Sequence, residues 1–198
     1  MIKLGILGPV GAGKSYVAQI FKNKSFPIFN ADQEVSKIYK RNFLINKKIS
    51  SYFNITLVNG KVKKEDLKTK LVEHPNKFKF LNNVIHPIVR KNLKDFLKKH
   101  KNKTLVVLDI PLLIENNMFE FVDLLIFVKA KKTTIRKRLE KRGLNKDFLA
   151  ILKSQQLSDK EKIKHSDFIV INNKNANLKL QINYILDIII LNDDLSNT

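Results

Sequence analysis

The stretch GPVGAGKS at residues 8–15 decides the class of fold, because it satisfies G-x-x-x-x-G-K-[ST] at every fixed position. An apolar run ends at Leu7 directly before it, and a helical pattern begins at Lys14. Glycines here let backbone N–H groups surround a phosphate, and the helix N-terminus adds partial positive charge. The rival G-x-G-x-x-G pattern fails, because no third glycine follows Gly11 and Gly13 at the required spacing. The stretch predicts a phosphate-binding P-loop.

Two side chains of this loop carry its chemistry. Lys14 is placed to reach the β- and γ-phosphates of a nucleotide, and the Ser15 hydroxyl is placed to bind Mg²⁺. No [NT]-K-x-D sequence for guanine recognition is present, which favours ATP. The residues that we expect to bind ATP in this region are Gly11, Ala12, Gly13, Lys14, Ser15 and Tyr16.

The rest of the chain alternates between apolar, β-branched runs and helical patterns. The runs cover residues 2–7, 27–30, 104–110, 124–129 and 168–171. Continuous apolar runs are typical of strands that are buried on both faces of a parallel sheet. The pattern predicts an α/β doubly wound fold, and 198 residues suit a single domain, 1–198.

Two segments fall outside this alternation. Residues 41–100 hold mostly helical patterns and predict a helical insertion, in which Pro87 should end one helix and open the next. Residues 131–165 predict two basic amphipathic helices that form a mobile lid over the phosphates. Gly143 should stop the first of these helices, and Asn145 should cap the second.

Acidic residues follow two of the predicted strands, where a parallel sheet places its ligands. Asp32 has two interpretations of about equal weight: a base that orients an acceptor hydroxyl, or the N-cap of the next helix. Asp109 ends an apolar strand in the Walker B manner and predicts a second Mg²⁺ ligand, held directly or through water. Glu115 either lines the acceptor site or is exposed to solvent.

Arginine and histidine supply the remaining candidates. Arg138 and Arg142 are four residues apart on one helical face, where they can neutralise charge on a transferring phosphoryl group. In isolation the same helix would be read as a solvated basic surface, and the P-loop favours the functional interpretation. His86 has no metal-ligand cluster beside it, and a lone histidine is usually structural.

Composition limits the partners and the location. The formal net charge is +20, but only five of the 38 basic residues are arginine and the lysines are spread along the chain. This favours a solvated lysine surface over a nucleic-acid platform. Cysteine is absent, and the apolar runs are too short for a signal peptide or a membrane span. We expect a cytoplasmic monomer or weak homo-oligomer, with no membrane or nucleic-acid partner and a disordered polar tail at residues 192–198.

Taken together, these motifs resemble those of the dephospho-CoA kinase family over essentially the whole chain. The matching segments, in chain order, are the P-loop, Ala31-Asp32, His86-Pro87, Pro111-Leu112-Leu113-Ile114-Glu115, Arg138 with Arg142, Gln156, and Asp167 with Asn172. Departures are Pro9, Tyr16, Asn30 and Ile114.

The resemblance implies a five-stranded parallel sheet ordered 2-3-1-4-5, with the insertion holding the acceptor. It implies phosphorylation of the ribose 3′-hydroxyl of dephospho-CoA by Mg·ATP. Asp32, Lys14 and Arg138 would be catalytic, and Asn172 would flank adenine. The acceptor-side residues would be Asp32, His86, Leu113 and Glu115.

Two other functions remain open at this stage. The first is another small-molecule P-loop kinase, acting on a nucleoside monophosphate or shikimate. The second is a basic nucleic-acid-binding ATPase, which would bind its partner in a salt-sensitive way.

Overall fold

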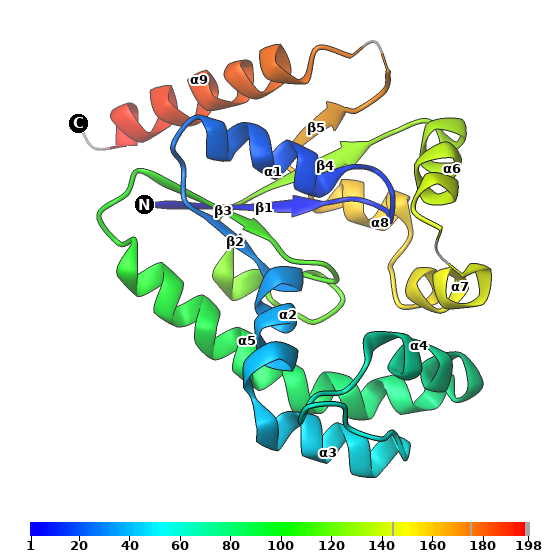
Figure 1. The fold of residues 1–198 in the computed structure, drawn as a ribbon. Coiled ribbons are helices and arrows are strands. Elements are labelled where there is room, and N and C mark those ends of the chain that lie inside the picture. The colour runs from blue at the N-terminus through cyan, green and yellow to red at the C-terminus, as the bar shows by residue number, and fades with distance from the viewer. Residues whose placement is uncertain (144, 175, 197–198) are drawn as a thin grey trace. The chain divides into compact units, whose positions relative to one another are not determined.

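The computed structural model describes residues 1–143, 145–174 and 176–196, with side chains described as far as residue 191. Its strands form one sheet in the order β2-β3-β1-β4-β5, which confirms the predicted order (Figure 1). The strands are β1 (Ile2–Leu7), β2 (Ile28–Asn30), β3 (Leu105–Asp109), β4 (Leu124–Lys129) and β5 (Phe168–Ile171).

Parallel pairing follows from the apolar runs. In β1, Ile2 pairs with Leu105 of β3 and Leu4 pairs with Leu124 of β4, both in parallel register. Strand β4 pairs in parallel with β5. Every residue of β3 is buried, as expected for a strand covered on both faces. Because the strands run the same way, their carboxyl ends share one edge of the sheet.

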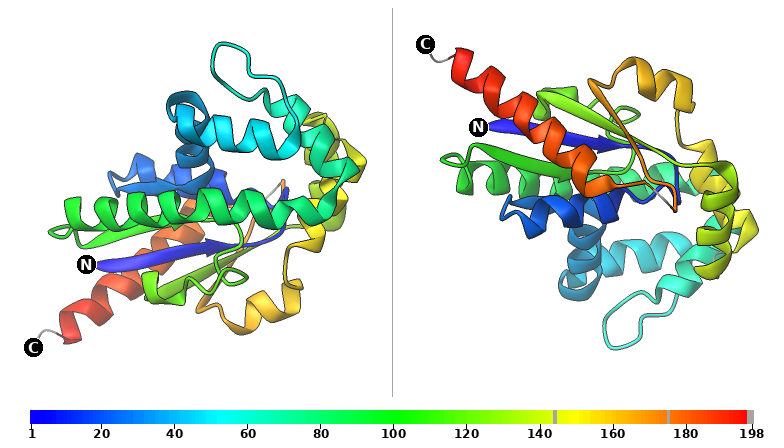
Figure 2. Two further views of the ribbon diagram at one scale, coloured as in Figure 1. Left: turned by 90° about the horizontal axis from the view of Figure 1, so that it is seen from below. Right: turned by 90° about the horizontal axis from the view of Figure 1, so that it is seen from above.

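The main core lies between the sheet and two helices, α1 (Lys14–Asn23) and α9 (Leu178–Ser196), which lie on the same side of it (Figure 1). Seen from above, α9 runs across the strands that it covers (Figure 2). Phe21 of α1 and Ile182 of α9 are fully buried in this core. The structure differs from the predicted disordered tail, because α9 continues to Ser196. Residues 197–198 of that tail lie outside the described residues.

A side chain of α9 covers part of the unpaired side of β5, the last strand of the sheet. At β5, the Gln181 side chain accepts a hydrogen bond from Ile171 N at 2.8 Å through Oε1. Its Nε2 donates to Ile171 O at 3.1 Å. A primary amide therefore occupies one donor and one acceptor that a further strand would otherwise use.

The chain divides into two compact units. The first contains Met1–Phe29, Asn102–Gly143 and Gln155–Thr198, and the second contains Asn30–Lys101 and Leu144–Ser154. The first unit also holds α6 (Lys132–Lys141) and α8 (Asp159–Lys164), with a 3₁₀ turn at Phe119–Phe121. The second holds α2 (Ala31–Arg41), α3 (Phe43–Phe53), α4 (Lys64–Glu73), α5 (Phe78–Lys99) and α7 (Lys146–Ser154), with a 3₁₀ turn at Pro75–Lys77.

The prediction for Pro87 is wrong, because α5 passes through this residue without ending. Proline removes one backbone hydrogen bond and disfavours a helix interior. Here the apolar face continues in register on both sides of it: Ile85 and Val89 are buried, and so is Leu93 one turn further on. Burial of one continuous face outweighs the local cost at Pro87.

Residues 131–165 hold three helices rather than the predicted two, because α8 follows α7. The predicted end of the first helix and the predicted cap of the second agree with the structure. Helix α6 ends at Lys141, and Gly143 follows with a φ of +59° while its N–H donates to Glu140 O. Asn145 Oδ1 accepts from Asp147 N at 2.8 Å, so this asparagine caps α7. Helix α7 packs against α4 within the second unit.

Candidate active site

The P-loop bridges β1 and α1, as its sequence predicts. Gly13 has a φ of +97°, and a Cβ at this position would lie 2.2 Å from Asn172 Nδ2. Both the backbone conformation and the close approach therefore require glycine at this point of the loop.

Lys14 lies over the beginning of the same loop. Its Nζ donates to Gly8 O at 2.8 Å and to Pro9 O at 3.3 Å. These carbonyl contacts hold the ammonium group beside the backbone that would surround a phosphate. The arrangement suits a cation that neutralises phosphate oxygens.

The two residues predicted to bind Mg²⁺ are brought into direct contact. Ser15 Oγ donates to Asp109 Oδ2 at 2.9 Å, although the residues are 94 positions apart. Asp109 ends β3 and Ser15 follows β1, so the shared edge of the parallel sheet explains why they meet. The Asp109 residue is buried. A hydroxyl and a carboxylate side by side form a set of oxygen donors that Mg²⁺ prefers.

Arg138 of α6 is fixed to the P-loop backbone. Its Nη1 donates to Ala12 O at 2.8 Å, with a longer contact of 3.4 Å to Gly11 O. Its Nη2 donates to the backbone and side-chain oxygens of Asn172, both at 3.1 Å. The guanidinium group therefore ties α6 to the loop and to the residue after β5.

Asn172 completes this network. It is 4% exposed, and its Nδ2 donates to Ala12 O at 2.8 Å. Ala12 O thus accepts from Arg138 and from Asn172 together. The sequence indicated Arg138 and Asn172 as separate nucleotide contacts, whereas the structure shows them bonded to each other. The shared acceptor in the loop could not be read from the spacing.

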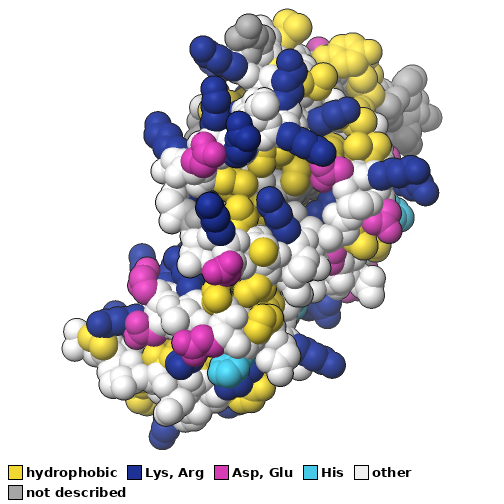
Figure 3. Space-filling view, turned by 90° about the vertical axis from the view of Figure 1, so that its right-hand side faces the viewer, with side chains coloured by type: hydrophobic (Ala, Val, Ile, Leu, Met, Phe, Trp, Pro, Cys, Tyr) yellow, Lys and Arg dark blue, Asp and Glu magenta, His cyan; other side chains and the backbone are white. Residues whose placement is uncertain are grey.

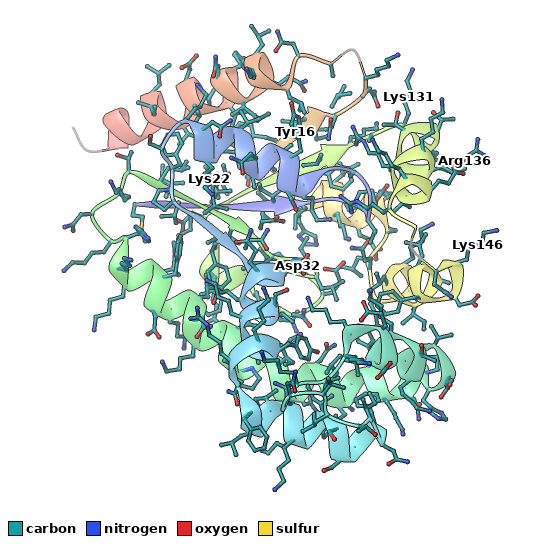
Figure 4. All side chains as sticks on the ribbon, viewed as in Figure 1. Tyr16, Lys22, Asp32, Lys131, Arg136 and Lys146 are labelled. Carbon is teal, nitrogen blue, oxygen red and sulfur yellow. The ribbon has the colours of Figure 1, made fainter. Side chains whose placement is uncertain are left out.

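The other predicted nucleotide residues are more exposed. Tyr16 lies on the first turn of α1 and is 59% exposed (Figure 4). Arg142 follows the last residue of α6, and its N–H donates to Arg138 O, so its backbone closes the helix end. Arg136 of α6 is exposed and lies 3.7 Å from Glu140 in an ion pair along the helix.

Two predicted acceptor residues follow β3 in the first unit. Leu113 is fully buried. Glu115 is not exposed, because its Oε1 lies 2.9 Å from Lys162 Nζ and accepts from Leu157 N at 2.9 Å. Sequence reasoning missed Lys162, since a lysine in a short polar helix carries no signal that it is buried.

Asp32 and His86, the remaining predicted residues, belong to the second unit. Asp32 lies in the first turn of α2 (Figure 4), but the N-cap is Asn30, whose side chain accepts from Gln33 N at 2.9 Å. The N-cap interpretation of Asp32 is therefore wrong.

His86 lines a hollow of about 660 Å³ on α5 together with Arg90 and Lys94. Burial, and then the neighbouring Arg90 cation, lower the pKa of His86 below its ordinary value of 6.5. The neutral imidazole, which can both donate and accept a hydrogen bond, is therefore favoured in this hollow.

Charge is widely distributed around these elements. Lys and Arg side chains are spread over the face in Figure 3, with Asp and Glu side chains among them. Of the helices that the structure describes, none has the length and apolar character needed to span a bilayer.

A sheet of this order, a P-loop after its first strand and a hydroxyl–carboxylate pair beside the loop define a P-loop kinase. The dephospho-CoA kinase family model matches residues 2–177. A dephospho-CoA kinase of Wolbachia pipientis wMel is 34% identical over 173 residues, covering 84% of this chain and 87% of the relative. The chain therefore belongs to the dephospho-CoA kinase family.

Solved structures share the fold. A crystal structure from Thermus thermophilus has a TM-score of 0.78 at 24% identity, covering 93% of this chain and 95% of that one. A dephospho-CoA kinase from Campylobacter jejuni has a TM-score of 0.64 at 23% identity, covering 94% of this chain and 96% of that one.

Proposed function

We propose that this protein transfers the γ-phosphoryl group of ATP to the ribose 3′-hydroxyl of dephospho-CoA, giving coenzyme A and ADP. The observation that carries this proposal is the contact between Ser15 and Asp109 beside the P-loop, in a chain of this family. The proposal includes action in the cytoplasm, as a monomer or a weak homo-oligomer.

The P-loop supplies the nucleotide side of the reaction. Backbone N–H groups and the N-terminus of α1 bind the phosphates, and Lys14 neutralises the β- and γ-oxygens. Arg138 orders the loop through Ala12 O and adds positive charge next to it. Asn172 flanks the adenine base of ATP. Tyr16 and Arg142, which are both exposed, contact the nucleotide with their side chains.

Ser15 and Asp109 are the residues that would hold Mg²⁺. Among the described residues no group of three or more acidic, histidine or cysteine side chains could hold a metal ion. Two protein oxygens nevertheless suit Mg²⁺, which is usually bound through one or two side chains with water and phosphate oxygens. The ion would supply charge neutralisation for the transferring group.

The second unit supplies the acceptor side in this proposal. Asp32 orients the 3′-hydroxyl and accepts its proton, with positioning as the larger part because the transition state is loose. Asn30 caps α2, so the Asp32 carboxylate is not used as the N-cap of this helix. His86 contacts the acceptor as a neutral imidazole, and residues 131–165 act as the lid.

The direct test measures ADP release by the purified protein with Mg·ATP and one acceptor at a time. The acceptors are dephospho-CoA, AMP, shikimate and none, and mass spectrometry identifies the product. Gain of one phosphoryl group by dephospho-CoA alone supports the proposal. Phosphorylation of AMP or shikimate instead would assign another small-molecule kinase. ATP hydrolysis that responds only to nucleic acid would refute a small-molecule acceptor.

The role of Asp32 is tested by Asp32→Asn with Asp66→Asn as its matched control. Asp66 is, like Asp32, an exposed aspartate in the first turn of a helix in the second unit, here α4. We expect Asp32→Asn to lower kcat about 100-fold or more while ATP binding is kept, and Asp66→Asn to be neutral. Equal turnover of the two variants would remove Asp32 from the reaction.

A further inference from the structure

Glu115 makes a buried connection between two segments that are far apart in the sequence. Its Oε1 is shared by Lys162 Nζ and Leu157 N, each at 2.9 Å. The side chains of Lys162 and Glu115 are 3% and 11% exposed. One carboxylate oxygen therefore anchors both the chain before α8 and the helix itself.

The second oxygen of the same carboxylate is unsatisfied. Glu115 Oε2 is buried and has no hydrogen-bond partner among the described residues. A buried pair of this kind is often no more stable than an apolar pair of the same size, because both ions lose their hydration. Stability alone therefore gives a weak reason for a charged pair at this place.

The loop that carries Glu115 begins at Asp109 and is strained. Leu112 has a φ of +59°, which is unfavourable for a residue with a bulky side chain. Hydrogen bonds from Asn116 N to Leu112 O and from Met118 N to Leu113 O, both 3.0 Å, span Glu115 and close the turn around it. Strained backbone persists where surrounding contacts hold it, and it clusters at functional sites.

Leu157 marks the point where the chain has just returned to the first unit. Residues 144–154, including α7, belong to the second unit, and Gln155 begins the return. Gly143 precedes this segment, and a Cβ at Gly143 would meet no heavy atom within 4 Å. Of the two ends of this segment, the one after Ser154 is therefore followed by a buried hydrogen bond to Glu115.

We propose that Glu115 is a positioning residue. It couples the loop after Asp109 to the return of the chain at Leu157, and so fixes one end of the α7 segment during turnover. Glu115 does not touch the acceptor in this assignment, which replaces the substrate contact predicted from the sequence. The effect on turnover rests on the function proposed above.

The test uses variants that separate the hydrogen bond from the charge. Glu115→Gln keeps an acceptor for Leu157 N, whereas Glu115→Ala removes it. We expect Glu115→Ala to lower kcat/KM for dephospho-CoA at least about tenfold, with the Kd for ATP within about twofold. Glu115→Gln should stay within about threefold of the wild type, because it restores the bond to Leu157. Glu120→Ala, at a nearby exposed glutamate, is the matched control.

Two results would overturn the positioning role. If Glu115→Gln is as impaired as Glu115→Ala although its Leu157 amide exchanges like that of the wild type, the bond to Leu157 is not what supports turnover. If Glu115→Ala matches the wild type, or loses ATP binding in parallel with turnover, the connection is irrelevant or merely structural.

A further variant protects the test against failure to fold. Glu115→Leu with Lys162→Met replaces the pair by apolar side chains, and we expect it to unfold at a similar urea concentration to the wild type. Its kcat/KM should nevertheless fall as in Glu115→Ala, since Leu157 N again lacks its acceptor. Wild-type kcat/KM in this folded variant would refute the proposal.

Hydrogen exchange gives a readout that does not depend on the reaction. The Leu157 amide should exchange at least about tenfold faster in Glu115→Ala than in the wild type, and unchanged exchange contradicts the proposal. A wild-type protein without acceptor-dependent turnover, but with this difference in exchange, would refute the proposed function and leave the anchoring role standing.

Discussion

Replacement of Gly13 by alanine is the sharpest perturbation that the site offers. The new Cβ would lie 2.2 Å from Asn172 Nδ2, and the residue would have to keep a φ of +97°. The positive φ costs an L-residue about 1–2 kcal/mol. Moving Asn172 away breaks its bond to Ala12 O, worth about 1 kcal/mol, and the bond from Arg138, worth about 1.5–3 kcal/mol. We expect a loss of about 3.5–6 kcal/mol in the free energy of unfolding.

Gly143→Ala is the matched control. Its φ of +59° carries a similar backbone cost, but a Cβ there meets nothing within 4 Å. The expected loss is therefore only about 1–2 kcal/mol. Urea denaturation followed by circular dichroism measures both variants, and nucleotide binding should fail in Gly13→Ala alone, because the loop backbone must move.

The reasoning is refuted if the two variants lose the same stability, or if Gly13→Ala still binds ATP like the wild type. If Gly13→Ala does not fold, the variant with Asn172→Ala added removes the atom that clashes. This double variant should fold and should be less stable than Asn172→Ala alone by only the backbone cost.

Three further outcomes are expected. Lys14→Ala should lower kcat/KM about 100-fold or more with an unchanged circular dichroism spectrum, and normal turnover would contradict the P-loop assignment. His86 has a pKa lowered by burial and by Arg90, so the unfolded chain binds its proton first. The free energy of unfolding should therefore fall as the pH drops through 6.5, by at most about 1.4 kcal/mol per pH unit. If the His86→Gln variant shows the same dependence of stability on pH, His86 is not the group responsible. Asn46 is buried, accepts from Val62 N at 2.9 Å and donates to Tyr39 O at 2.9 Å, so it bridges two segments of the second unit. Asn46→Ala should therefore lower the free energy of unfolding by about 2–4 kcal/mol in a urea titration, and a loss near zero would contradict this bridging role.

The strands and the P-loop could be predicted because they depend on local pattern. Apolar runs gave β1, β4 and β5 with their observed bounds. The contact between Ser15 and Asp109 can also be expected from the sequence, since both residues lie near the carboxyl ends of strands in a parallel sheet.

Other features depend on contacts that no local pattern contains. Pro87 stays helical because a buried face of α5 continues past it. The N-cap of α2 is Asn30 because its side chain accepts the hydrogen bond from Gln33 N. The burial of Lys162 beside Glu115 joins residues 47 positions apart, and spacing cannot reveal such a pair. The interpretation of Glu115 as a solvent-exposed residue is therefore wrong, because its side chain is only 11% exposed.

The amide of Gln181 has a consequence for how copies of this protein behave together. Strand β5 is the last strand of the sheet, and Ile169 and Ile171 are exposed on it. An open edge with apolar side chains is a template on which another chain can add a strand. Because Gln181 already occupies the N–H and C=O of Ile171, an incoming strand would have to displace it first. Edge-to-edge pairing of two copies at Ile171 would therefore carry the additional cost of releasing this one side chain.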